Sequence, residues 1–178
     1  MKKTLLIIVI SICFSACSTS QQIFHLNNTA TINLPKAAVR LDSTSVKSFI
    51  EENFKSSEID PKLKYSFKSD EILISFNDKK LSHPLETSYL SQTKGGLDEI
   101  NKLGDSSRNY KSEIRKINNN GSALFLSYKS DGSEYFRYFY LGDNFTYALN
   151  GILQFRHKDS IQAVNILNNM LNSIQVKK

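Results

Sequence analysis

Cys17 is the residue whose type and position in the sequence point most directly to chemistry. It follows an apolar run at residues 5–14 and two small residues, and an uncharged polar stretch comes after it. The run is too short to span a bilayer, which needs about 20 apolar residues. Because the run stands directly behind Lys2, Lys3 and Thr4, it is typical of a secretory signal. The sequence therefore predicts export, with a thiol placed where the signal ends.

The four residues Phe14-Ser15-Ala16-Cys17 resemble the lipobox of bacterial lipoprotein precursors, with Phe14 where leucine is commonest. The resemblance implies cleavage before Cys17, a diacylglycerol thioether on its sulfur, and acylation of the freed amine, since stable anchoring needs two or more acyl chains. It predicts a signal peptide at 1–16, a lipidated cysteine and flexible tether at 17–28, and one domain at 29–178. The expected location is the bacterial cell envelope, lipid-anchored and facing the periplasm. A plain signal peptide with an incidental cysteine is the alternative.

Size, charge and cysteine content limit the class of protein. Without its signal the chain would have 162 residues, which suits one ordinary domain. Cys13 would be removed and Cys17 would carry lipid, so no disulfide is expected and packing alone must hold the core. The formal net charge would fall from +6 to +4. The remaining charges alternate in sign, as they do over residues 47–62, which argues against a nucleic-acid partner.

A search for catalytic or metal-binding patterns is negative. The sequence contains no H-E-x-x-H, G-x-S-x-G, P-loop or G-x-G-x-x-G pattern. His25, His83 and His157 are far apart and have no second ligand at metal spacing, so each is predicted to be a surface residue. The adjacent carboxylates Asp70-Glu71 and Asp98-Glu99 would point to opposite faces of a strand and form no dyad. No catalytic residue, metal site or cofactor is predicted.

Hydrophobic periodicity predicts the early elements. They are a strand at 30–34, an amphipathic helix at about 43–55 after the N-cap residues 42–45, and a β-hairpin from 63–67 and 72–76. Residues 78–108 are the least regular part, with a short helix that Gly104 ends. Within them, Lys94-Gly95-Gly96 is interpreted as a plain connection or as a flexible binding loop.

The last third of the sequence gives the clearest pattern. Four β segments follow one another at 109–117, 122–129, 135–140 and 145–155. Tight connections such as Asp131-Gly132 make this meander antiparallel. Asp159 and Gln162 predict a capping box at the start of a final helix. The helix has one apolar stripe, made of Ile161, Ala163, Val164, Ile166, Leu167, Met170, Leu171 and Ile174. The fold class is therefore α+β, a mostly antiparallel sheet with helices packed on its faces.

Aromatic residues are crowded onto two paired strands of the meander. Because strand faces alternate, some of the rings point away from the final helix. One interpretation is that both faces are covered and the rings are core. The other is an aromatic and cationic surface for a protein partner, made of Tyr135, Arg137, Tyr138, Phe139, Tyr140 and Arg156.

The order of these last elements resembles a known group of folds. The aromatic strand 135–140, its Gly-Asp turn, the strand Tyr147-Ala148-Leu149-Asn150-Gly151 and the helix ending at 166–174 look like the C-terminal half of the Mog1/PsbP-like superfamily. That superfamily includes many small bacterial lipoproteins. The resemblance covers about 109–175 and implies a layered sandwich, an antiparallel sheet between helices. Its members bind proteins or have no known role.

Two classes of function follow. The first is a lipid-anchored binding or accessory protein without catalytic activity, which contacts another envelope protein. An immunity protein that caps a secreted toxin is a special case. The second is an envelope hydrolase with a site assembled from loops. The missing nucleophile motif favours the first.

Overall fold

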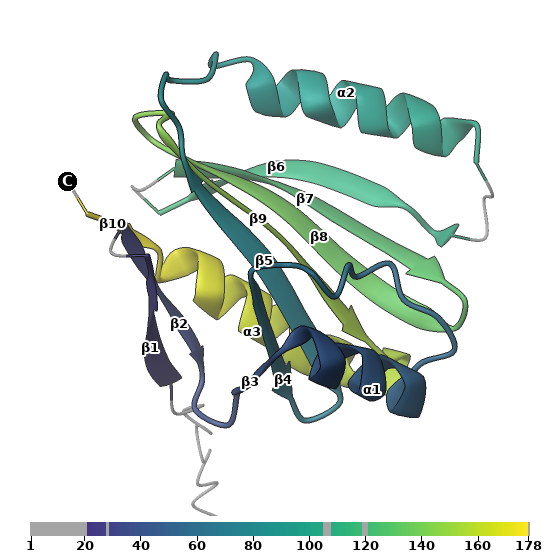
Figure 1. Ribbon diagram of the computed structural model, residues 1–178. Helices are drawn as coiled ribbons and strands as arrows, with labels where there is room; N and C mark the ends of the chain where they lie inside the picture. The colour runs from purple at the N-terminus through teal and green to yellow at the C-terminus, as the bar shows by residue number, and fades with distance from the viewer. Residues whose placement is uncertain (1–20, 28, 105–107, 119–120, 178) are drawn as a thin grey trace, which may run out of the picture.

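Two antiparallel sheets and three α-helices make up the computed structural model, which describes residues 21–27, 29–104, 108–118 and 121–177 (Figure 1). The large sheet has the strand order β3-β4-β5-β9-β8-β7-β6. Its strands are β3 (Val39–Leu41), β4 (Tyr65–Ser69), β5 (Ile72–Lys80), β6 (Lys111–Ile117), β7 (Gly121–Ser130), β8 (Ser133–Gly142) and β9 (Tyr147–Phe155). The small sheet has the order β1-β2-β10, with β1 (Gln21–Leu26), β2 (Ala30–Pro35) and β10 (Gln175–Val176).

The meander formed by β6 to β9 is antiparallel throughout, as its short connections predict. At the turn between β7 and β8, Asp131 has φ 47° and Gly132 has φ 79°. Two successive positive φ values fit the turn that matches the twist of a hairpin, and Asp-Gly suits them because glycine has no Cβ. The predicted α+β class, a mostly antiparallel sheet with helices on its faces, is confirmed.

Helix α3 (Ser160–Asn172) and the β1–β2 hairpin together cover one face of the large sheet. The predicted stripe is confirmed for most of its members, because Ala163, Ile166, Leu167, Met170, Leu171 and Ile174 are buried in this layer. The prediction is wrong for Ile161, which is 78% exposed, and for Val164, which is 40% exposed. The buried residues follow the helical spacing i, i+3, i+4, i+7 from Ala163, and Ile161 and Val164 lie outside this spacing.

The start of α3 also differs from the predicted capping box. The side chain of Asp159 makes no cap hydrogen bond, and a short 3₁₀ helix at His157–Asp159 leads into α3 instead. The Gln162 amide donates to Asp70 in the β4–β5 turn at 2.7 Å. Tertiary contact with a neighbouring turn has thus replaced the local hydrogen bond that the sequence spacing favours.

Helices α1 (Ser43–Asn53) and α2 (Tyr89–Lys102) lie on the opposite face of the large sheet (Figure 1). Asp42 caps α1 as predicted, since its carboxylate accepts a hydrogen bond from the Ser45 backbone N–H at 2.8 Å. That hydrogen bond holds the pKa of the Asp42 carboxyl below its usual range. Val46 and Phe49 are the buried residues of α1.

Helix α2 occupies much of the stretch 78–108, where the sequence predicts irregular structure with a short helix that Gly104 ends. The helix is confirmed and ends at Lys102, but it begins earlier than predicted, at Tyr89. The prediction of a loop at Lys94-Gly95-Gly96 is wrong, because these residues lie inside the helix. Both glycines face solvent, and a Cβ at either position would meet nothing within 4 Å. Two glycines lower helix propensity, so contacts elsewhere along α2 must hold it. None of the helices in the described part of the chain is long and apolar enough to span a bilayer.

The predicted tether at 17–28 contains a strand. Residues Gln21–Leu26 form β1, which pairs with β2 from Gln21 opposite Pro35 to Leu26 opposite Ala30. Leu26 is fully buried, and Phe24 packs on the rings of Tyr65 and Phe67. The alternation of Ile23 and Phe24 with polar neighbours was too short to signal this strand, which needs β2 beside it.

In the middle of the large sheet, the ring of Tyr138 on β8 lies against Gly151 on β9. A Cβ at Gly151 would stand 2.4 Å from the Tyr138 hydroxyl oxygen and 2.8 Å from the Phe76 Cβ. Glycine is therefore required at 151 for this ring to lie flat in the core. The ring in turn fills the space under α3 and the hairpin.

We predict that Leu167→Ala combined with Leu171→Ala prevents stable folding. Each truncation of a buried leucine costs about 2–5 kcal/mol, against a total stability of about 5–15 kcal/mol for an ordinary domain. Both side chains are buried under the sheet, at 5% and 1% exposure. Thermal unfolding measured by circular dichroism checks this, and an unchanged melting temperature would mean that α3 does not pack as described.

We also predict that Gly151→Ala destabilises the domain by about 1–3 kcal/mol, the usual cost of inserting a methyl group into a filled core. Gly95→Ala is the matched control. Its Cβ meets open space on an exposed helix, so the substitution is expected to be neutral or slightly stabilising. Urea unfolding of both variants checks the contrast, and equal stability would show that Tyr138 can move away.

Candidate functional site

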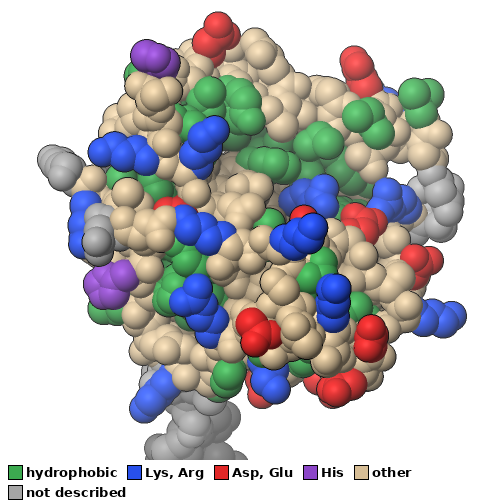
Figure 2. Space-filling view, in the orientation of Figure 1, with side chains coloured by type: hydrophobic (Ala, Val, Ile, Leu, Met, Phe, Trp, Pro, Cys, Tyr) green, Lys and Arg blue, Asp and Glu red, His purple; other side chains and the backbone are tan. Residues whose placement is uncertain are grey.

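The face of the large sheet that carries α1 and α2 is left open in its middle. Figure 2 shows hydrophobic side chains in a hollow below α2, bordered by several Lys and Arg side chains. Helix α2 lies against β6 and β7, while α1 and the 54–64 loop cover the other end of the sheet. As a result Asn150, in the middle of the interior strand β9, is exposed.

A cavity of about 210 Å³ lies at this opening. We call the surface around it the open sheet face, lined by Glu58, Asp60, Leu63, Arg137, Phe139, Asn150 and Ile152. Tyr138 and Gly151 also border it, but the Tyr138 side chain packs on the other face of the sheet, with α3. The register of the strands explains its composition. Asn150 pairs with Phe139 on one side and with Asn77 on the other, and Ile152 pairs with Arg137. Side chains from three neighbouring strands therefore project together.

Glu58 forms the charged wall of the open sheet face. Its carboxylate accepts a hydrogen bond from the Tyr128 hydroxyl at 2.7 Å and forms an ion pair with Arg108. The Arg137 guanidinium lies 4.0 Å from the same carboxylate. Burial of the Tyr128 ring, together with its hydrogen bond to Glu58, raises the pKa of the Tyr128 hydroxyl. The phenol therefore stays protonated and serves as a hydrogen-bond donor to the loop.

The loop that carries Glu58 is fixed to the sheet through Gln154, which is fully buried. The Gln154 amide nitrogen donates to the Ser56 carbonyl at 2.8 Å and to the Ser133 hydroxyl at 3.0 Å. Its amide oxygen accepts from the Ser57 hydroxyl at 2.5 Å. A buried amide with all these partners holds the loop rigidly, because breaking one bond would leave a polar atom unsatisfied.

On the other side, Asp98 fixes α2 to the edge of the sheet. Its carboxylate accepts a hydrogen bond from the Tyr110 hydroxyl at 3.1 Å and further bonds from Lys94 and Ser112. The Lys94 ammonium, followed by the Ser112 hydroxyl, holds the pKa of the Asp98 carboxyl below its usual range. Leu90 adds a buried apolar contact. These contacts set the distance between α2 and the 54–64 loop, and with it the width of the opening.

The open sheet face combines an aromatic ring, aliphatic side chains, a carboxamide, a guanidinium and two carboxylates. The side-chain amide of Asn150 has no hydrogen-bond partner among the described residues. Aromatic residues and arginine are enriched at protein interfaces, and free amides suit hydrogen bonds to a partner. The residues that line the cavity include no Ser, Cys, His or Lys.

The structure divides the six residues that the sequence predicts as a partner surface. Arg137 and Phe139 lie on the open sheet face. The prediction is wrong for three tyrosines, which are fully buried: Tyr135, Tyr138 and Tyr140. Tyr138 and Tyr140 point toward α3 and the hairpin, because alternate residues of β8 face opposite ways. Tyr135 faces the other way, but it stacks on Tyr128 at 5.2 Å beneath the 54–64 loop.

The sequence also predicts Arg156 as part of the partner surface, but in the structure its side chain makes contacts that stabilise the fold. Its guanidinium donates twice to the Asn53 carbonyl, at 3.2 and 2.7 Å, and lies 3.3 Å from the Glu71 carboxylate. It thereby ties the end of β9 to the end of α1. Cys17, the predicted lipidation site, lies outside the described residues.

The predicted surface histidines are confirmed, since His25, His83 and His157 are all exposed. His157 lies 2.8 Å from the Glu134 carboxylate. In the described part of the chain, no three His, Cys, Asp or Glu side chains come together as a metal site would require.

Sequence analysis missed Asn150, Glu58, Asp60 and Leu63 as site residues. A polar residue between Leu149 and Gly151 in a mostly apolar strand is the signal that marks Asn150. For the three loop residues the sequence holds no such signal, because residues distant in sequence, such as Gln154 and Tyr128, place the loop.

Comparison with known proteins gives likeness in fold alone. No protein-family model and no curated protein matches the sequence. The match to the solution structure of cyanobacterial PsbP (CyanoP) from Synechocystis covers 94% of this chain and 99% of the CyanoP chain, with 11% sequence identity and a TM-score of 0.55. A crystal structure from Bacteroides thetaiotaomicron covers 90% of this chain and 49% of its own, at 11% identity and a TM-score of 0.47. The match to the Ran-binding protein Mog1p of Saccharomyces cerevisiae covers 89% of this chain and 96% of the Mog1p chain, with 10% sequence identity and a TM-score of 0.45.

The likeness to CyanoP extends well beyond the C-terminal half, which carries the resemblance in the sequence. It spans 94% of the chain. The chain therefore has a PsbP-like fold, a mostly antiparallel sheet between helices.

Proposed function

We propose that this chain is a non-catalytic accessory protein of a bacterial cell envelope, which binds another protein through the open sheet face. The observation that carries the proposal is the exposure of Asn150 in the middle of an interior strand. Helices cover both ends of this face of the sheet, and the uncovered centre between them is available to a partner.

The composition of the open sheet face supports a protein as the partner. Phe139 and Leu63 supply apolar area, while Arg137 and Asn150 supply directional donors. Such a mixture, with a small apolar centre and a polar rim, is the usual anatomy of a protein interface. A cavity of about 210 Å³ is below the roughly 300–1,000 Å³ of typical small-molecule pockets, so it suits one inserted side chain.

A hydrolase has less support. Two carboxylates line the face: the oxygens of Glu58 are already engaged by Tyr128 and Arg108, and Asp60 accepts a hydrogen bond from the Lys62 backbone N–H. A general base must instead be free to take a proton from water or from a nucleophile.

Lipid attachment at Cys17 is the second part of the proposal. It is supported by the signal-like sequence that precedes this cysteine and by the position of Cys17 only four residues before β1 begins. The lipid would thus hold the folded domain close to the membrane, facing the periplasm.

We predict that Cys17→Ala abolishes lipid labelling and releases the protein from membranes, or leaves it unprocessed. The thioether needs the cysteine sulfur, and no other thiol follows it in the sequence. Incorporation of labelled fatty acid and membrane fractionation measure the effect. A variant that still takes up label and stays membrane-bound would refute the lipid anchor.

We predict that Asn150→Arg removes partner binding without loss of stability, because it places a long charged side chain over the centre of an exposed surface. Asn172→Arg is the matched control, since Asn172 is also exposed but lies at the end of α3 on the opposite side of the sheet. Cross-linking of the full-length protein in its own envelope, followed by mass spectrometry, identifies the captured protein.

The expected result is one captured protein with wild type and Asn172→Arg that disappears with Asn150→Arg. Equal capture by both variants would place the interface elsewhere. Turnover of an envelope substrate by the purified protein would overturn the non-catalytic proposal itself.

A further inference from the structure

Three large aliphatic side chains are exposed around the first described residue of the chain. Ile23 on β1 is 69% exposed, Val39 at the start of β3 is 54% exposed, and Ile161 at the start of α3 is 78% exposed. They come from distant parts of the sequence. Their exposure is costly in water, and groups of exposed apolar side chains commonly mark a contact surface.

Hydrogen bonds at the start of β1 hold two of these regions together. The Gln22 amide donates to the Pro35 carbonyl at 3.0 Å and to the Ala38 carbonyl at 2.8 Å. The turn between β2 and β3, and Val39 after it, therefore stays beside the beginning of β1. Lys36 in this turn is exposed and forms no ion pair within the described part of the chain.

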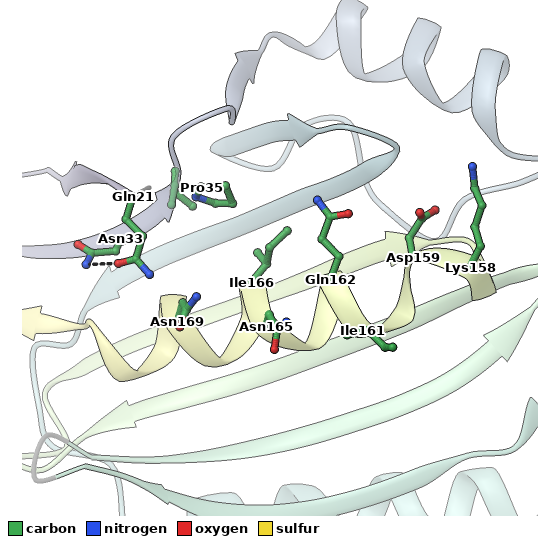
Figure 3. Close-up of a pocket in the computed structure, with 11 residues that line it drawn as sticks. Gln21, Asn33, Pro35, Lys158, Asp159, Ile161, Gln162, Asn165, Ile166 and Asn169 are labelled. Carbon is green, nitrogen blue, oxygen red and sulfur yellow. Dashed lines mark hydrogen bonds between the residues drawn. The ribbon is translucent and has the colours of Figure 1, made fainter. Parts of the chain in front are cut away.

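A groove of about 310 Å³ connects the same end of β1 to the start of α3 (Figure 3). Leu34 and Ile166 are its buried apolar residues. Gln21 and Asn33, joined by a hydrogen bond of 2.8 Å, stand on the strand side, and Ile161 projects from the helix side. Carboxamides form much of the rim, and charged groups occur only at one end, at Lys158 and Asp159.

The sequence limits how far this surface can be from Cys17. Cys17 precedes Gln21 by four residues, and four residues span at most about 14 Å when fully extended. A lipid on Cys17 would therefore hold Gln21, at one end of the groove, within about 14 Å of Cys17. Because the chain between Cys17 and β1 is so short, the bilayer would be the surface nearest to this end of the fold.

We propose that this end of the molecule rests on the membrane, with Ile23, Val39 and Ile161 inserted among phospholipid headgroups; the proposal rests on the lipid anchor at Cys17. We call these three residues with Lys36 the anchor-side surface. Apolar side chains of proteins that lie on membranes enter roughly 5–10 Å into the boundary between headgroups and acyl chains. The Lys36 ammonium suits anionic headgroups.

The orientation has a consequence for the open sheet face. Helix α2 lies at the opposite end of the molecule from the start of β1 (Figure 1). With the anchor-side surface on the bilayer, α2 and the opening beside it point into the aqueous space. A partner protein then reaches Asn150 without contacting the membrane.

Single tryptophans can test the orientation, because the sequence contains no tryptophan. The full-length lipidated protein is reconstituted into vesicles of phosphatidylglycerol and phosphatidylcholine, with or without brominated acyl chains. Ile161→Trp and Val39→Trp report on the anchor-side surface. Ile100→Trp on α2 is the matched control, since Ile100 is also an isoleucine on a helix and is 68% exposed.

We expect blue-shifted emission and strong quenching by brominated lipid for tryptophan at 161 and 39, and neither effect at 100. Vesicle flotation and the melting temperature are measured for each variant. Variants that float and are folded, but show no quenching at 161 and 39 or equal quenching at all three positions, would overturn the membrane contact while the anchor stands. Loss of flotation in every variant and in wild type would instead refute the anchor on which the proposal rests.

Discussion

In the part of the chain that the structure describes, three helices and one hairpin must cover two faces of a seven-stranded sheet, and the structure depends on this constraint. One face of the seven-stranded sheet is closed by α3 and the β1–β2 hairpin, which together bury a continuous apolar layer. The other face has α1 at one end and α2 at the other. Since an antiparallel sheet can leave part of one face in water, the domain stays stable with its centre open. The candidate site is the part of the sheet that no helix reaches.

Polar contacts, rather than buried apolar area alone, decide where the 54–64 loop and helix α2 lie on the sheet. Gln154 fixes the 54–64 loop, Tyr128 fixes Glu58 within it, and Asp98 fixes α2 to the edge strand. Each is a directional bond that is partly or fully shielded from water, so losing it would leave an unsatisfied polar group. The same contacts therefore stabilise the 54–64 loop and α2 on the sheet and set the width of the opening between them.

Only part of the candidate site could be predicted from the sequence. The crowding of aromatic residues on β8 marked the right strand, and alternation implied that its rings divide between two faces. Arg137 and Phe139 line the open sheet face, whereas Tyr138 and Tyr140 are core residues. Period-two alternation says which residues share a face, but it does not say which face the hairpin will cover. Asn150 could be identified as a site residue only from the tertiary structure, which places its two neighbouring strands beside it.

The sequence by itself determined the order and type of most elements, the antiparallel meander and the α+β class. These features follow from short-range rules, namely hydrophobic period, turn chemistry and helix capping. Tertiary structure decided the rest. It made β1 a strand by placing β2 beside it, turned Ile161 to solvent, and kept α2 helical through Gly95 and Gly96. These outcomes depend on contacts between residues distant in sequence, whose free energies exceed the local preferences that the sequence displays.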